Sequence, residues 1–167
     1  MMTQVSISRR SAATGAILFL LGIVPALAAP TGLHLRAISV DAAPLAAKGV
    51  PRVAESIRRA MVPALAEAFA GLVLPGDRAG AVLRVSVDSV EFASDGGGYD
   101  ALTRPTDYLH ATGTLVGGRG EILGSYPLLA ALVVSGPVNA NFGNDLTLRT
   151  QALARYYAAW LRKEIGG

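Results

Sequence analysis

The side chains that could perform acid–base or metal chemistry are few and widely spaced. The chain has two histidines, His34 and His110, and both fall at polar positions of predicted strands. A metal site would need the two close together with a carboxylate beside them. No serine lies in a G-x-S-x-G turn. A small hydrolase or a carbohydrate- or anion-handling enzyme would therefore use His110 with Asp107, if both side chains reach one pocket.

Two glycine- or asparagine-rich stretches supply further polar groups. Asp95 and Asp100 surround three glycines, but their spacing does not follow a calcium loop and favours a solvated connection. Asn141 and Phe142 precede a predicted helix, where backbone amides favour anions and the ring could stack on a sugar. A turn leading into the helix cap is the favoured explanation of these residues. The candidate ligand-binding residues are Asp95, Asp100, Asp107, His110, Asn141 and Phe142, and we expect no catalytic residue, metal or cofactor.

The first 28 residues have the order of an export signal. Arg9-Arg10 is followed by a short apolar run over 16–24, by Pro25 and by the small-x-small tripeptide 26–28. The run is shorter than the roughly 20 residues of a membrane-spanning helix, although an uncleaved anchor is the alternative. We expect cleavage after Ala28 and a periplasmic or secreted domain over 29–167. The route is ordinary secretion or, because Arg9-Arg10 resembles the twin-arginine motif, export in the folded state.

Charge and cysteine content narrow the class of protein. Removing Arg9 and Arg10 with the signal leaves 13 basic and 12 acidic residues, a net charge of +1, which gives no indication of nucleic-acid binding. The absence of cysteine excludes disulfides, thiol catalysis and zinc sites built on cysteine. We also expect no lipid-modified cysteine and no integral membrane segment after cleavage.

Periodicity predicts the first half of the domain. Residues 33–41 alternate as a strand whose apolar side switches after Ala37, which indicates a bulge or burial on both faces. Residues 42–49 are predicted as a loop. A helix begins at Pro51 and keeps its apolar stripe across Pro63, so we predict one long, kinked helix that ends at Gly71 or Gly76. Residues 81–92 form the clearest strand.

The second half is predicted as a hairpin and a helix. Strands over 107–116 and 121–134 flank a glycine turn at 117–120, and Pro127 indicates an edge or a bulge. The last helix starts after Asn144 or Asp145. Its apolar stripe places Tyr157 and Trp160 in the core and Tyr156 at the margin. Four arginines on the two helices fit an ordinary solvated face: Arg52, Arg59, Arg155 and Arg162.

The predicted order, β-α-β-β-β-α, indicates one α+β domain. Strands joined by hairpins with helices on one face form a two-layer sandwich, here a mainly antiparallel sheet of about four strands with two helices on one face. This layout resembles small α+β proteins of bacterial envelopes, many of them lipoproteins and most without an assigned activity. The chain departs from those lipoproteins in lacking the lipobox cysteine.

Export, a patterned core and the absence of a catalytic motif favour a binding or envelope assembly-accessory module over an enzyme. We expect an envelope protein or a small ligand, not nucleic acid, to bind at the open face of the sheet, a strand edge or the long loops. The alternatives are the small enzyme built on His110 and Asp107, and a structural subunit that self-associates through the Pro127 edge.

Overall fold

The computed structural model describes residues 32–92, 106–133 and 146–166. Its elements follow in the order β1 (Leu35–Asp41), α1 (Ala43–Ala47), α2 (Pro51–Ala68), β2 (Ala81–Glu91), β3 (Thr106–Val116), β4 (Ile122–Val133) and α4 (Leu146–Gly166). The predicted α+β class and its order β-α-β-β-β-α are confirmed, with α1 as an additional short helix. The predicted signal over 1–28 lies outside the described residues.

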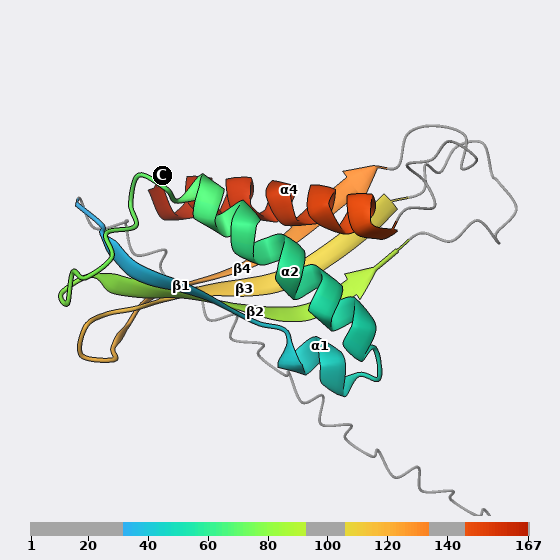
Figure 1. The fold of residues 1–167 in the computed structure, drawn as a ribbon, viewed down its shortest axis with the longest axis horizontal. Coiled ribbons are helices and arrows are strands. Elements are labelled where there is room, and N and C mark those ends of the chain that lie inside the picture. Colours follow the sequence, from blue (N-terminus) through green and yellow to red (C-terminus); the bar gives the residue numbers. More distant parts are fainter. Residues whose placement is uncertain (1–31, 93–105, 134–145, 167) are drawn as a thin grey trace, which may run out of the picture.

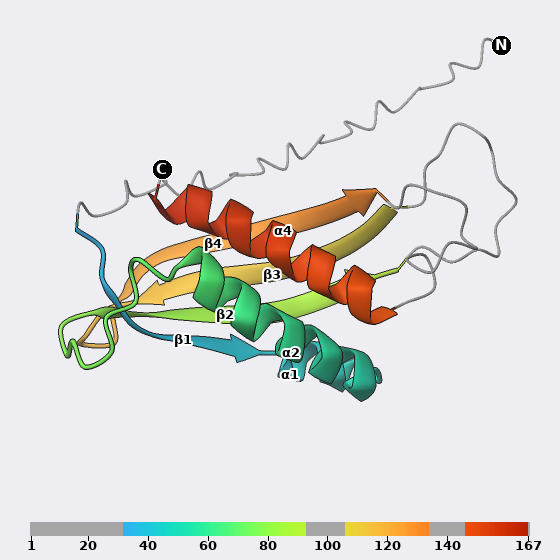
Figure 2. The ribbon, with the colours of Figure 1, turned by 45° about the horizontal axis from the view of Figure 1, so that its top comes forward.

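The four strands form one open sheet in the order β1-β2-β3-β4 (Figure 2). β1 pairs with β2 in parallel, and β2–β3 and β3–β4 are antiparallel, so the sheet is mainly antiparallel as predicted. Parallel neighbours need a crossover connection, which α1 and α2 supply between β1 and β2. The predicted irregularity in the first strand is a register shift between Leu35 and Ala37.

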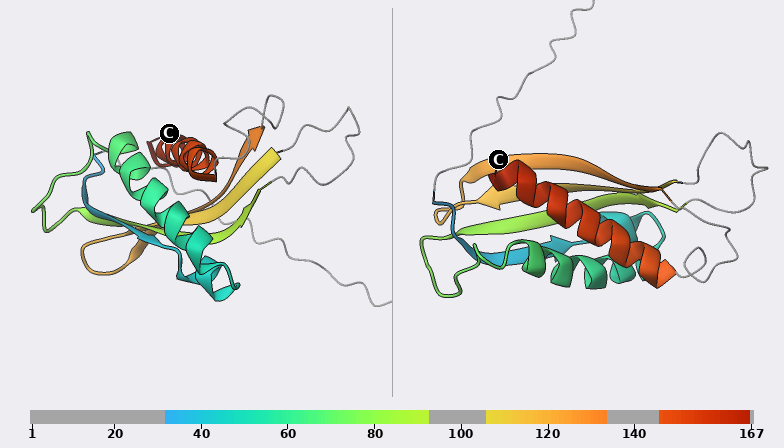
Figure 3. Two further views of the ribbon diagram at one scale, coloured as in Figure 1. Left: turned by 45° about the vertical axis from the view of Figure 1, so that its right-hand side comes forward. Right: turned by 90° about the horizontal axis from the view of Figure 1, so that it is seen from above.

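Helices α2 and α4 lie on the same face of the sheet and make the second layer (Figures 1 and 3). In the view from above, α2 runs along the β1 side and α4 crosses the sheet diagonally (Figure 3). The core between the layers is apolar, and its largest fully buried side chains include Leu35, Phe69, Ile57, Met61, Leu65, Leu83, Leu109, Leu115, Tyr157 and Leu161.

Close packing of α4 on β3 depends on a glycine. A Cβ atom at Gly113 would lie 2.7 Å from Cδ1 of Leu161, nearer than real Cβ atoms approach. Leu161 is fully buried, so its side chain has little room to give way. Gly113 therefore sets how closely the helix approaches the sheet.

Helix α2 runs unbroken through Pro63, as predicted, with that proline exposed on its outer side. The predicted end at Gly71 or Gly76 is wrong, because the helix stops at Ala68 and Phe69 leaves it to become fully buried in the core. The predicted loop over 42–49 is also corrected. It holds α1, whose start is fixed by Pro44 in the first turn and by the Ala43 N–H donating to Asp41 Oδ1 at 2.8 Å.

The aromatic residues of α4 divide between core and surface. Tyr157 is fully buried, as predicted, and its hydroxyl has no hydrogen-bond partner in the described part of the chain. Burial raises the pKa of the Tyr157 hydroxyl. The predicted core position of Trp160 is wrong: the side chain is 52% exposed, because it lies beyond the stripe formed by Leu153, Tyr157 and Leu161.

The hairpin between β3 and β4 forms as predicted. The Gly117 N–H donates to the Glu121 carbonyl at 2.8 Å, and Gly120 has a φ of +88°, which glycine adopts without strain. Pro127 lies in β4, which is an edge strand as expected. Among the described helices, none is both long enough and apolar enough to span a membrane.

Candidate functional site

Asp107, one of the sequence candidates, is a fully buried partner of Arg149. Arg149 Nε donates to Asp107 Oδ2 at 2.7 Å, and Arg149 Nη2 donates to Asp107 Oδ1. The guanidinium also lies over the Phe92 ring, 5.2 Å from its centroid. The pair thus joins the start of β3 to the first turn of α4. Since both carboxylate oxygens are engaged and buried, Asp107 is placed to hold the two layers together.

His110 lies on the opposite, open face of the sheet. Its Nδ1 is 3.7 Å from Asp88 Oδ2, and the Thr112 hydroxyl donates to that same oxygen at 3.2 Å. A triad for nucleophilic attack needs the histidine between the hydroxyl and the carboxylate. Here the carboxylate lies between the other two groups, so this cluster does not activate Thr112.

The strand alternation separates Asp107 from His110. Along β3, Asp107, Leu109 and Ala111 face the helices and are buried, whereas Tyr108 and His110 point to the open face. The sheet therefore lies between the two side chains, and the pocket that the enzyme hypothesis required does not form. No cluster of three or more metal-ligating side chains occurs among residues 32–92, 106–133 and 146–166.

The other four sequence candidates, Asp95, Asp100, Asn141 and Phe142, lie outside the described residues. His34, the second histidine, is exposed just before β1.

An apolar hollow lies along the outer side of β1, and we call it the β1 groove. It has a volume of about 300 Å³ and is lined by Ile38 and Val40 from β1, Val62 and Ala66 from α2, and Val73. Val62 is 47% exposed although it lies on a helix in contact with the core. Apolar side chains exposed around a hollow are typical of interaction sites.

The backbone of β1 is open along this groove. β1 is an edge strand, and alternate residues of an edge strand point their N–H and C=O groups away from the sheet. Residues 72–74 take the first of these positions: the Leu35 N–H donates to the Leu72 carbonyl and the Leu74 N–H donates to the Leu35 carbonyl, both at 2.8 Å. In the described part of the chain, no segment pairs with the outer edge after Leu35.

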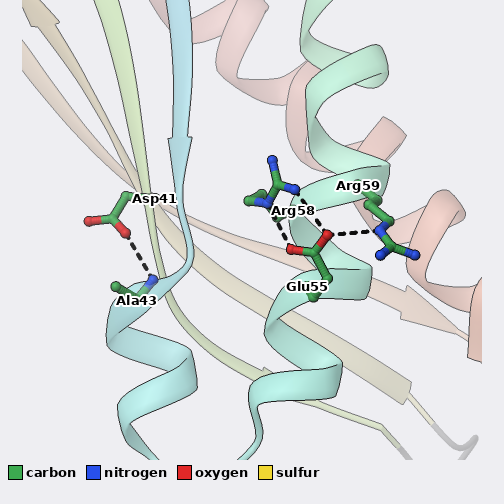
Figure 4. Close-up of polar contacts among 5 residues, drawn as sticks. All are labelled: Asp41, Ala43, Glu55, Arg58 and Arg59. Carbon is green, nitrogen blue, oxygen red and sulfur yellow. Dashed lines mark hydrogen bonds and ion pairs between the residues drawn. The ribbon is translucent and has the colours of Figure 1, made fainter.

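A second hollow, lined in part by the polar residues Asp41, Glu55 and Arg58, adjoins the β1 groove at Val40 (Figure 4). There Glu55 accepts hydrogen bonds from Arg58 Nε at 2.9 Å and from Arg59 Nε at 2.8 Å. These bonds lower the pKa of the Glu55 carboxyl to about 2 and raise the pKa of the Arg58 guanidinium. Asp41 lies at the same end, so the carboxylates of Asp41 and Glu55 balance the charges of Arg58 and Arg59.

The two edges of the sheet differ in their capacity to accept another strand. β4 carries Pro127, which cannot donate to a ladder and is a common protection of edge strands. The regular part of β1 after its bulge, residues 37–41, contains no proline and has an apolar hollow beside it. The sequence predicted that a strand edge could be a binding surface. Of the two edge strands, β1 is better suited to this role than β4.

Sequence reasoning missed Ile38, Val40 and Val62 as site residues. The signal was present for the first two, since the switch of apolar side after Ala37 turns them toward the helices. For Val62 the sequence showed only an apolar residue next to Pro63 and outside the buried stripe of α2, which did not indicate a binding role.

No protein-family model matches the chain, and no curated protein matches it. Among solved structures, a candidate lipoprotein from Caulobacter crescentus CB15 is 12% identical with a TM-score of 0.46, covering 78% of this chain and 86% of that one. A minor lipoprotein from Acinetobacter baumannii is 16% identical with a TM-score of 0.41, covering 78% of this chain and 91% of that one. Likenesses at this level assign no activity.

Proposed function

We propose that the protein is an exported binding or assembly-accessory module of the bacterial envelope that holds an extended segment of a partner protein along β1. The observation that carries the proposal is the β1 groove, where an apolar hollow adjoins a strand edge that no described segment pairs with beyond Leu35. An added strand gains affinity from backbone hydrogen bonds and specificity from pockets that receive alternate side chains.

The dimensions of the β1 groove suit this mode of binding. A strand laid beside residues 37–41 points every second side chain toward the helix layer, into the space between Val40 and Val62. The hollow of about 300 Å³ has room for branched aliphatic side chains. The segment 72–74 already forms a short parallel bridge with Leu35, which shows that this edge bonds to extended backbone.

The export signal predicted over 1–28 supports an envelope location. The enzyme alternative has no geometric support, since Asp107 and His110 lie on opposite faces of the sheet.

Photo-crosslinking in the native envelope tests the proposal. A photoreactive residue at Val62 is expected to give a specific adduct whose crosslinked peptide has alternating apolar residues. The same probe at Ile122, which is 70% exposed and lies in β4, is the matched control. Adducts that are the same from both positions would contradict a site at β1.

A synthetic copy of the captured segment then tests the binding mode. Hydrogen exchange of the residue 37–41 amides is expected to slow when the peptide binds, because the added strand pairs with them. Val62→Asp should abolish this protection and Ile122→Asp should not. A peptide that binds without protecting β1 would show that strand addition is not the mode.

A further inference from the structure

The outward surface of α4 exposes large aromatic residues beside cations. Trp160 is 52% exposed and Tyr156 is 50% exposed, and they lie one helical turn apart. Lys163 Nζ lies over the Trp160 ring, 5.2 Å from its centroid. Tryptophan and tyrosine next to lysine and arginine are the residues that settle at the boundary between lipid headgroups and water.

We propose that the outer surface of α2 and α4, the outer helix surface, docks on a bilayer leaflet that contains anionic lipids. This inference does not depend on strand addition at the β1 groove.

Charge is distributed unevenly over the fold in a way that fits this partner. Outside the Arg149–Asp107 pair, helices α2 and α4 together have six basic side chains (Arg52, Arg58, Arg59, Arg155, Arg162 and Lys163) and three acidic ones (Glu55, Glu67 and Glu164), a net charge of +3. Arg149 and Asp107 neutralise each other inside. The remaining described residues have five basic and five acidic side chains, so the net positive charge of the described fold lies on its helix layer.

A groove between the two helices brings three of these arginines together. It has a volume of about 800 Å³, and Arg52 and Arg59 from α2 line it with Arg155 from α4. Two carboxylates, Glu55 and Glu67, also line the groove, and Glu55 is bonded to Arg58 and Arg59, so the lining has a net charge of +1 from three basic and two acidic side chains. A lipid phosphate in this groove would be within reach of guanidinium groups from both helices.

A lipid surface explains the combination better than a soluble polyanion does. A polyanion uses the cations alone and leaves the apolar rings of Tyr156 and Trp160 in water. A leaflet surface accepts the rings among its headgroups and attracts the cations through its negative potential.

The chain contains its own probe for this proposal, because Trp160 is its only tryptophan. The protein purified from its native envelope is mixed with phosphatidylcholine vesicles with or without phosphatidylglycerol. We expect the Trp160 emission to shift to the blue only with the anionic vesicles, and the shift to disappear at high salt, where surface attraction is screened. Unchanged emission on anionic vesicles at low salt would overturn the proposal.

Charge-matched variants separate a specific surface from general attraction. Arg155→Gln is expected to weaken partition onto anionic vesicles about fivefold, the effect of one cation near a charged leaflet. Arg119→Gln removes the same charge from the β3–β4 turn and should leave partition nearly unchanged. Circular dichroism confirms that both variants remain folded. Equal losses in the two variants, or binding to soluble polyphosphate without binding to vesicles, would refute docking by the helix layer.

Discussion

Replacing Asp107 with asparagine tests whether this residue is a structural partner of Arg149 or a ligand-binding residue. The asparagine keeps the size and shape of the side chain but removes its charge. Arg149, whose side chain is 11% exposed, would then carry a buried charge without its carboxylate partner. We expect the variant to fold less stably, and to do so whatever ligand is present.

The size of the effect follows from the burial of both groups. Breaking one side of a buried ion pair costs about 3–5 kcal/mol, because the remaining charge loses its compensation. Small domains have about 5–15 kcal/mol of total stability. Asp107→Asn should therefore remove a large part of the stability and lower the melting temperature by on the order of 10–20 °C.

Urea unfolding followed by far-ultraviolet circular dichroism measures this change. Glu91→Gln, on an exposed side chain at the end of β2, is the control and should stay within about 0.5 kcal/mol of wild type. The double variant Asp107→Leu with Arg149→Met replaces the whole pair with apolar groups and should recover most of the loss.

A loss below about 1 kcal/mol for Asp107→Asn would refute the structural assignment, since no buried charge would then be left uncompensated. If ligand binding were lost while stability held, Asp107 would instead belong to the ligand site that the sequence suggested.

Two further substitutions probe the packing of α4. Tyr157→Phe removes a buried hydroxyl without a hydrogen-bond partner in the described residues, so it should leave stability unchanged or raise it by about 1 kcal/mol. The pKa of Tyr157 is raised in the folded state, so above about pH 10 only the unfolded tyrosine ionises and wild type should lose stability. Tyr157→Phe should lose less stability over the same range. Urea unfolding at pH 8 and about pH 11 measures the change in both proteins. Gly113→Ala should cost about 1–3 kcal/mol of stability, because the added Cβ presses on Leu161. The control Gly71→Ala should cost nothing, since no atom lies within 4 Å of its added Cβ. Thermal melts compare the two variants, and equal melting temperatures would contradict the contact between Gly113 and Leu161.

The class and order of the elements could be predicted because each strand and long helix has a strong period of its own. β2 alternates cleanly, and the stripe of α2 continues across Pro63, so local pattern and tertiary burial agree. The bulge in β1 was readable for the same reason, since a switch of apolar side in a strand has few physical causes.

The candidate site was less predictable because its features depend on which elements become neighbours. Nothing local shows that Asp107 meets Arg149, or that Val62 faces Val40 across a groove. Trp160 was misplaced because a helical period gives the centre of the buried stripe well and its margins poorly. α1 was missed because five residues are too few to show a period.

The parallel pairing of β1 with β2 also determines the order in which the fold can form. β2, β3 and β4 each have an antiparallel neighbour that follows or precedes them in the chain, so this meander can assemble from contacts close in sequence. Among the described strands, β1 pairs only with β2, which begins at Ala81, so this pairing must wait until the α1–α2 crossover has been made. Among the described strands, β1 therefore emerges well before the strand with which it pairs. Until then, both edges of β1 and the apolar residues beside them remain available to other chains.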